Sequence, residues 1–240
     1  KKEGYLIYKL ADNMKNCIKI DADLFRKLDV KRGLRNEDGT GVLVGLTNIG
    51  NVVGYERTEN GLKPIEGKLY FRGYEISDLV HAVLNEQRFG FEEIAYLLLS
   101  GGLPDAEELE QFRHLLVGNM PLMSKTMLNI VELEGTDIMN ILARSVLELY
   151  TYDNTPDDIS RENLMRQSVE LISKFPTIIA YAYNMLRHKT FGRSLHIRHP
   201  KENFSLAENF LYMLLGNNYT PLDARTLDLL LILQAEHGGG

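Results

Sequence analysis

Residues 163–187 read NLMRQSVELISKFPTIIAYAYNMLR, and this stretch decides the class of fold. Its apolar residues recur three and four positions apart, which is the period of a helix with one buried face. They are Leu164, Val169, Leu171, Ile172, Ile178, Ile179, Tyr181 and Leu186. The pattern predicts a helix over 160–188 with a kink or break at Pro176, because proline removes a backbone hydrogen bond. Such a stripe could pack in a core or against a partner helix, and a core is the default.

The same helical period continues on both sides of this stretch. It predicts further helices at about 21–30, 75–85, 91–100, 105–117, 122–133, 136–150, 205–215 and 221–237. The segment 39–72 differs, because short runs of Val, Leu, Ile, Tyr and Phe alternate with Asn-Gly, Pro and Glu-Gly turns. We therefore predict a mainly α, multi-helical protein with a small β meander of three or four strands near residues 41–72.

Composition excludes several classes of protein. The 240 residues are 44% apolar, which is enough to bury a core and argues against disorder. The net charge of −6 argues against a general binder of nucleic acid or of anionic membranes. No apolar run reaches the ~18 residues of a membrane span. With a single cysteine, Cys17, an intramolecular disulfide is impossible, and we expect a soluble, cytoplasmic protein.

The most informative candidate residue is His237, in the run Gln234-Ala235-Glu236-His237-Gly238. The helix predicted over 221–237 ends at this residue, so a charged imidazole and a following glycine fit a helix cap. An imidazole followed by glycines also fits acid–base or hydrogen-bond chemistry, because glycine lets a ligand approach closely. Spacing by itself favours the cap.

Two other groups could contact an anionic ligand. Lys31, Arg32 and Arg35 could hold a phosphate group, although three basic residues are more often a solvated surface. His196 and His199 flank an arginine in a predicted loop and could contact a carboxylate substrate, although loop histidines are more often simply exposed. No pair of histidines has the HExxH spacing, so the sequence supports no metal site.

Seven blocks, taken in order, resemble the large domain of citrate synthase. They lie at 30–36, 41–47, 67–73, 96–99, 102–104, 209–214 and 235–239. The likeness runs from about residue 21 to the end and is weakest between 105 and 135. It implies an N-terminal helical segment at 1–36 and a part of the helical large domain at 37–240.

The resemblance also implies an activity. The family joins acetyl-CoA to oxaloacetate through an enol intermediate and hydrolyses the citryl-CoA that is formed, with acetyl-CoA as a substrate and no permanently bound cofactor. His237 matches the histidine of the family's (A/S)-(D/E)-H motif. In this reading, His237 is a neutral imidazole that donates a hydrogen bond to the thioester oxygen, while an aspartate takes the methyl proton. Family members are homodimers through helix packing, so we expect a homodimer.

The sequence departs from the family in two places and leaves alternatives open. Gln234 stands where many relatives have histidine. The segment before Asn209 lacks a further substrate-binding histidine, and His196 and His199 are the candidates to substitute for it. We expect the sequence to stop inside a motif, ahead of the catalytic aspartate and the second histidine, and these 240 residues to be inactive by themselves. The alternatives are a 2-methylcitrate synthase that uses propionyl-CoA and a helical assembly module without catalysis.

Overall fold

The structure is a computed structural model that describes residues 21–27, 33–35, 41–42, 47–59, 61–132 and 135–237. The chain divides into two compact units, residues 1–46 and 47–240. In the first unit, α2 (Ala22–Lys27) begins after Asp21, whose carboxylate accepts the N–H of Asp23. The Asp21 carboxylate therefore caps the start of this helix. Residues 28–30 of this expected helix lie outside the described residues, and the expected boundary after residue 36 stays a prediction.

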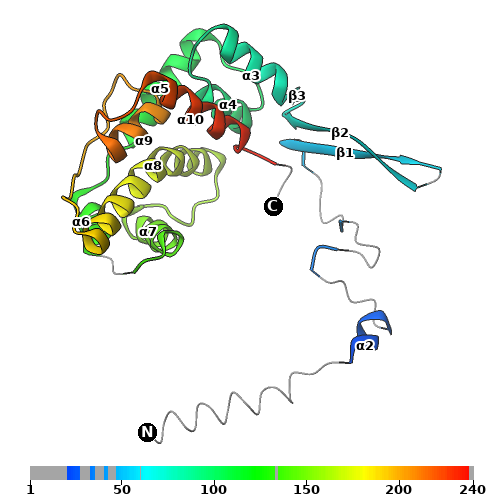
Figure 1. Cartoon of the computed structure of the whole chain (residues 1–240), viewed down its shortest axis with the longest axis horizontal. Helices are drawn as coiled ribbons and strands as arrows, with labels where there is room; N and C mark the ends of the chain where they lie inside the picture. Colours follow the sequence, from blue (N-terminus) through cyan, green and yellow to red (C-terminus); the bar gives the residue numbers. More distant parts are fainter. Residues whose placement is uncertain are drawn as a thin grey trace, which may run out of the picture. The chain divides into compact units, whose positions relative to one another are not determined.

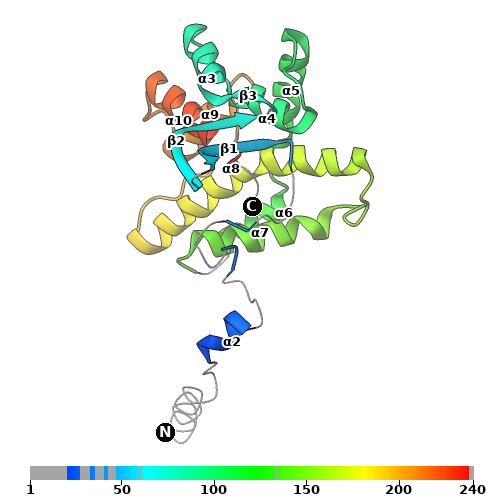
Figure 2. The ribbon, with the colours of Figure 1, turned by 90° about the vertical axis from the view of Figure 1, so that its right-hand side faces the viewer.

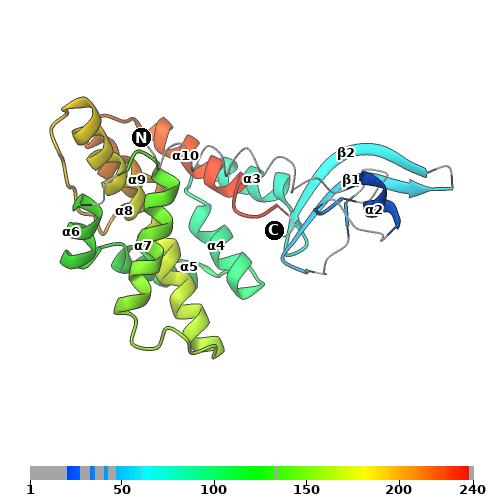
Figure 3. The same ribbon diagram turned by 90° about the horizontal axis from the view of Figure 1, so that it is seen from below.

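The second unit begins with a three-stranded antiparallel sheet in the order β1-β2-β3. The strands are β1 (Gly50–Thr58), β2 (Gly61–Phe71) and β3 (Tyr74–Glu75). Gly50 pairs with Phe71 at the base of the β1–β2 hairpin, which projects away from the helices (Figures 1 and 3). The side chains of β2 are exposed along most of its length and become buried only at Phe71. The predicted small β meander is thus confirmed for the described residues, and residues 43–46 of the predicted segment lie outside them.

Eight helices follow the sheet within the described residues (Figure 1). They are α3 (Ile76–Asn85), α4 (Phe91–Ser100), α5 (Ala106–Asn119), α6 (Ser124–Glu132), α7 (Ile138–Tyr152), α8 (Arg161–Phe191), α9 (Leu206–Leu215) and α10 (Pro221–Leu233). Asp105, Ser205 and Thr220 begin α5, α9 and α10 with reciprocal capping boxes, in which the side chain and the third helical residue satisfy each other's backbone N–H. The predicted mainly α fold is confirmed.

The long helix α8 runs through Pro176 without a break. Its two halves lie at an angle to each other in Figure 2, so the structure retains the expected kink and excludes the break. Tertiary packing overrides the local effect of the proline, because Pro176 itself and the following Thr177 and Ile178 are buried. The Thr177 hydroxyl donates a hydrogen bond of 2.9 Å to the Met120 carbonyl at the end of α5. This bond fixes the middle of α8 to its neighbour.

The apolar interior falls into two main clusters. The larger one joins α5, α6, α7, α8 and α9, with Met120, Ile178, Tyr181 and Met213 almost completely buried. The other joins the base of the hairpin to α3, α4 and α10 through Phe71, Leu79, Val83, Ile94, Leu97 and Ile232. A smaller cluster of Ala95, Phe112, Leu116 and Val169 lies between α4, α5 and α8. The end of α10 therefore belongs to the hairpin side of the molecule.

Candidate active site

The candidate site begins where α10 ends. Helix α10 ends at Leu233, with Gln234 as its C-cap, four residues before the predicted end at 237. The N–H of Gln234 still bonds to the Leu230 carbonyl, but the N–H of Ala235 bonds to Ile232, only three residues back. This tightened last turn ends the helix. The interpretation of His237 as part of a helix cap is therefore wrong, because His237 lies beyond the last turn.

The three residues after the cap run toward the start of β1 (Figure 1). Ala235 packs against the apolar cluster that joins the base of the hairpin to α3, α4 and α10, here called the hairpin-side cluster, which includes Ile232. The Glu236 side chain is half-buried and lies directly against the buried Gly50. Its Oε1 accepts the backbone N–H of His237 at 3.0 Å. The imidazole of His237 is exposed at this point.

Arg72 fixes the residues that precede Gly50 on the hairpin side of this site. Its Nε and Nη2 donate to the Leu98 carbonyl near the end of α4, at 3.2 and 2.7 Å, and its Nη1 donates to Asn48 Oδ1 at 3.0 Å. Its backbone N–H bonds to the Ile49 carbonyl at 2.7 Å. Arg72 adopts a left-handed conformation with φ of 49°, which is uncommon outside glycine and places it in the tight turn between β2 and β3. It thereby ties residues 48 and 49 to the helical body.

A cleft of about 450 Å³ opens at the base of the hairpin. It is lined by Thr47, Asn48, Ile49, Gly50, Asn51, Tyr70, Arg72 and Gly73. Gly50 thus lines the cleft and also contacts Glu236, the residue before the candidate histidine. Hydroxyl, amide and guanidinium groups in the lining can hydrogen-bond an oxygen-rich ligand.

Two buried carboxylates brace the helices behind the site. Asp228 in α10 is 1% exposed and accepts the N–H groups of Gly90 and Phe91, at 2.8 and 3.1 Å, at the start of α4. Glu92 in α4 is also 1% exposed and accepts the N–H of Leu206 at the start of α9, at 2.7 Å. Burial raises the pKa of Asp228 to about 6, against the lowering effect of its backbone hydrogen bonds. These carboxylates link α10, α4 and α9.

Four residues of this region were not predicted as site residues from the sequence: Asp228, Gly50, Glu236 and Arg72. A signal for Asp228 exists, because a single carboxylate stands in the apolar run 227–233. A buried charge needs partners, so such a residue predicts an internal hydrogen-bond site. Gly50 offers no comparable signal, because its partner Glu236 lies far away in the sequence.

His196 and His199 lie in the connection between α8 and α9, and both side chains are exposed. The backbone carbonyl of His196 accepts a hydrogen bond from Asn184 Nδ2 at 3.2 Å. Arg198, between them, turns inward: its Nη1 donates to the Met213 carbonyl and its guanidinium packs against Gly216. The structure thus places the two histidines on a different segment from His237, and their substrate-binding role stays a prediction.

The predicted basic cluster is only partly described. Lys31 and Arg32 lie outside the described residues. Arg35 forms an isolated antiparallel bridge with Gly41 in the first unit. Within the described ranges, no group of three or more His, Cys, Asp or Glu side chains could hold a metal ion. None of the helices in that same part of the chain is long and apolar enough to cross a membrane.

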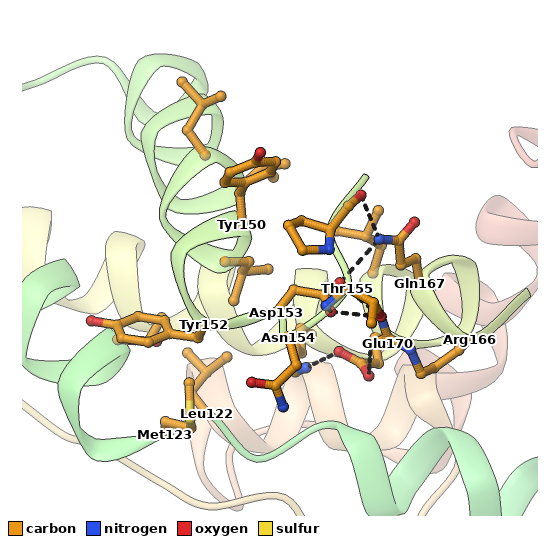
Figure 4. A pocket seen from close by; sticks show the side chains of 17 residues that line it. Leu122, Met123, Tyr150, Tyr152, Asp153, Asn154, Thr155, Arg166, Gln167 and Glu170 are labelled. Atoms are coloured by element: carbon orange, nitrogen blue, oxygen red, sulfur yellow. Dashed lines mark hydrogen bonds and ion pairs between the residues drawn. The ribbon is translucent and has the colours of Figure 1, made fainter. Parts of the chain in front are cut away.

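A second cavity, of about 600 Å³, lies between α6, α7 and the first half of α8 (Figure 4). Arg166 Nη2 donates to both oxygens of Asp153, at 2.7 and 2.8 Å, and its Nη1 donates to Glu170. Lys174 is paired with the other oxygen of Glu170 at 2.7 Å. The hydrogen bond from Arg166 lowers the pKa of Asp153. Both cations are thus paired with carboxylates of the same cavity, which makes it a poor site for an anion.

Comparison with known proteins identifies the family. The sequence profile described as "Citrate synthase, C-terminal domain" matches residues 37–240, most of the chain. The chain belongs to the citrate synthase family. It is 34% identical over 178 residues to a citrate synthase of Deinococcus radiodurans, which covers 72% of this chain and 46% of that protein. It is 30% identical over 175 residues to citrate synthase 2 of Bacillus subtilis, covering 72% and 44%.

Solved citrate synthase structures share the fold. The enzyme of Pyrobaculum aerophilum matches with a TM-score of 0.68 at 29% identity, over 85% of this chain and 49% of that one. The Thermotoga maritima citrate synthase matches with a TM-score of 0.63 at 26% identity, over 87% and 47%. The chain spans about half the length of the citrate synthases that it matches. The resemblance found in the seven sequence blocks is thereby confirmed.

Proposed function

We propose that this protein acts in the citrate synthase reaction, joining the methyl carbon of acetyl-CoA to the carbonyl carbon of oxaloacetate. Membership of the family supports the reaction class. The observation that carries the proposal at the level of residues is the position of His237. It lies in the matched region, directly after a glutamate that packs against the base of the hairpin.

The role that we propose for His237 is that of a hydrogen-bond donor to a substrate oxygen. Removing a proton from the thioester methyl group puts negative charge on the thioester oxygen, and a preorganised donor there contributes a rate factor of ~10²–10³. His237 lies beyond the last turn of α10, where the field of the helix has little effect on the imidazole. Its exposed ring is open to a ligand.

The substrates that we propose are acetyl-CoA and oxaloacetate, with water consumed and CoA and citrate released. Electrons balance without an oxidant or reductant, because the new carbon–carbon bond replaces a C–H bond and the thioester is hydrolysed. The proposed reaction therefore needs no permanently bound redox cofactor. The single cysteine of the chain also fits our proposal of a reducing compartment such as the cytoplasm.

The test measures CoA release by the full-length gene product that contains this chain. We expect His237→Ala to lower kcat by about 10²- to 10³-fold. The control is His81→Ala, which removes a helical histidine for which we propose no role. If His237 contacts oxaloacetate instead of the thioester, the KM for oxaloacetate changes more than kcat. Unchanged turnover and KM in His237→Ala would contradict the role of this residue.

The same assay separates acetyl-CoA from propionyl-CoA. One extra methylene changes selectivity by only ~1–3 kcal/mol, so kcat/KM is compared for the two thioesters on one preparation. A higher value for propionyl-CoA would replace our proposal with a 2-methylcitrate synthase. The absence of turnover with both would favour a helical assembly module.

We further propose that the protein is a homodimer, as expected from the family. Large apolar side chains lie exposed on one face of α7. Met139 is 72% exposed, Leu147 is 73% exposed and Tyr150 is 54% exposed, and their spacing of eight and three residues places them on the same side of the helix. An apolar helix face of this kind is typical of a surface that a partner covers.

A further inference from the structure

The contact between Gly50 and Glu236 is unusually close. A Cβ atom at residue 50 would lie 2.6 Å from Cγ of Glu236 and 3.0 Å from its Oε1. Real Cβ atoms do not approach other heavy atoms to 2.6 Å, so a side chain at residue 50 must displace Glu236. The backbone of Gly50 does not adopt the left-handed conformation that would itself favour glycine. The reason for a glycine at this position is therefore the lack of space for a side chain. The glycine thus forms a seat for one particular side chain.

The carboxylate that occupies this seat also contacts the next residue. Oε1 of Glu236 accepts the backbone N–H of His237 at 3.0 Å. The same oxygen lies 3.0 Å from the position that a Cβ of residue 50 would take. The Glu236 side chain is therefore held between the start of β1 and the backbone of His237. Because a peptide N–H moves with its residue, this bond restrains the backbone from which the imidazole projects.

The seat itself is anchored to the rest of the molecule. Gly50 is buried and pairs with Phe71, whose side chain is 0% exposed, at the base of the hairpin. The two residues before Gly50 are held by Arg72, whose guanidinium also reaches the end of α4. Gly50 is thus fixed by the hairpin and by a helix, whereas His237 follows α10. Glu236 connects these elements.

We propose that Glu236 is a positioning residue for His237 and that Gly50 is the seat that orients Glu236. This inference rests on the proposed role of His237 in the reaction. Glu236 does not need to touch the substrate: its packing against Gly50 and its bond to the His237 N–H set the direction of the imidazole. A displacement of about 1 Å at a reacting centre costs up to about 100-fold in rate, so a shift of this segment has a measurable effect.

The first test uses glycine variants of the full-length gene product. We expect Gly50→Ala to lower kcat/KM by about 10- to 100-fold, because its methyl group displaces Glu236. The matched controls are Gly54→Ala and Gly67→Ala in the same hairpin, where a Cβ would meet no atom within 4 Å. Activity of Gly50→Ala equal to that of these controls would overturn the proposal.

The second test asks whether the effect of Gly50 passes through Glu236. Glu236→Ala should lower kcat/KM as far as Gly50→Ala, and the double variant should be no worse than either, because the clash and the hydrogen bond involve the same side chain. Glu236→Gln should retain most of the activity, since its amide oxygen accepts the same N–H in the same seat. Additive losses in the double variant, or a Glu236→Gln variant as impaired as Glu236→Ala, would overturn the proposal.

A spectroscopic measurement separates this inference from the proposed function. The ring resonances of His237 in a ¹H–¹⁵N spectrum should shift in Gly50→Ala and Glu236→Ala and stay unchanged in Gly54→Ala. This readout does not depend on turnover. If these resonances move while His237→Ala has full activity, positioning is supported and the proposed catalytic role fails. If His237→Ala loses activity while the resonances and activity of Gly50→Ala match those of the controls, the catalytic role stands and the positioning role fails.

Discussion

At the scale of single residues, the interior behind the candidate site is shaped by carboxylates at helix starts. A helix N-terminus presents N–H groups without partners inside the helix, and a carboxylate satisfies them while it gains from the positive end of the helix dipole. Asp228 does this for α4 and Glu92 does it for α9. Both are almost completely buried, so their hydrogen bonds fix how α10, α4 and α9 fit together.

The raised pKa of Asp228 has a consequence for stability. The folded protein holds the proton of Asp228 up to about pH 6, whereas the unfolded chain releases it near its ordinary pKa of 3.8. The folded state therefore binds more protons between these values, and the free energy of unfolding falls as pH rises through this window. The raised pKa of Asp228 adds about 3 kcal/mol to the free energy of unfolding below this pH window, and this stabilisation is lost above the window.

Urea unfolding between about pH 4 and pH 7 checks this effect. We expect the decline in unfolding free energy to be absent in Asp228→Asn, since an amide does not titrate. The control is Asp223→Asn, which removes an exposed carboxylate whose pKa the Thr220 backbone N–H lowers. The Asp223 contribution has the opposite sign and is lost only as pH falls below its ordinary pKa of 3.8, so it stays nearly constant between pH 4 and pH 7. An Asp228→Asn variant with the pH dependence of the unmodified protein would contradict the assignment to Asp228.

Among individual residues, His237 could be predicted from the sequence, but the contact of Glu236 with Gly50 beside it could not. The run Ala235-Glu236-His237-Gly238 resembles a family motif, so its histidine stands out without a structure. The seat at Gly50 joins residues that are far apart in the chain, and only tertiary structure brings them together. Nothing in the local sequence distinguishes Gly50 from Gly54 or Gly67, which occupy open space.

At the scale of elements, α8 shows how one long helix is held against its neighbours. Thr177 is completely buried, and its hydroxyl satisfies the Met120 carbonyl, which the end of α5 leaves without a helical partner. Asn184, two turns further along, donates to the carbonyls of His196 and Met213 and so fixes α8 to the connection and to α9. Polar side chains thus set the position of a helix whose apolar face drives the packing.

Thr177→Val should destabilise the protein by about 1–3 kcal/mol, because it leaves the buried Met120 carbonyl without a donor. Urea unfolding of the variant measures the change. Thr126→Val is the matched control: Thr126 in α6 is also completely buried, and its Oγ1 has no hydrogen-bond partner within the described structure. That control should be neutral or stabilising. Equal losses of stability in the two variants would contradict the importance of the Thr177 bond.

The elements themselves were largely predictable, and the two differences have physical causes. Apolar periodicity located the helices after residue 73, because amphipathic helices carry their burial pattern in the local sequence. Of the two outcomes predicted at Pro176, the kink is present and the break is not, since burial of the flanking residues outweighs one missing backbone bond. The predicted end of α10 lies four residues too far along the chain, because Ala235 and Glu236 are compatible with a helix. In the structure the helix ends at Leu233, and the Glu236 side chain packs on Gly50.

At the scale of the whole molecule, the exposed face of α7 is the surface at which we propose that two copies of the protein meet. Leu147→Glu puts a charge on this face and should convert dimers into monomers, which sedimentation velocity measures. The matched control is Leu222→Glu, at a leucine 67% exposed at the start of α10, on a different helix. It should leave the association unchanged. A Leu147→Glu protein that sediments like the control would place the dimer contact elsewhere.

The separation of the interior into two main clusters bears on how the protein responds to heat. His237 follows the hairpin-side cluster, through Ile232 and Ala235, whereas α6 and α7 belong to the other. Cooperative units of a protein open with different free energies, and the hairpin adds long exposed strands to the unit that carries the histidine. A local opening at β1 releases the contact between Gly50 and Glu236 while most helices persist. If His237 has the role that we propose, we expect activity to be lost at a lower temperature than helical circular dichroism.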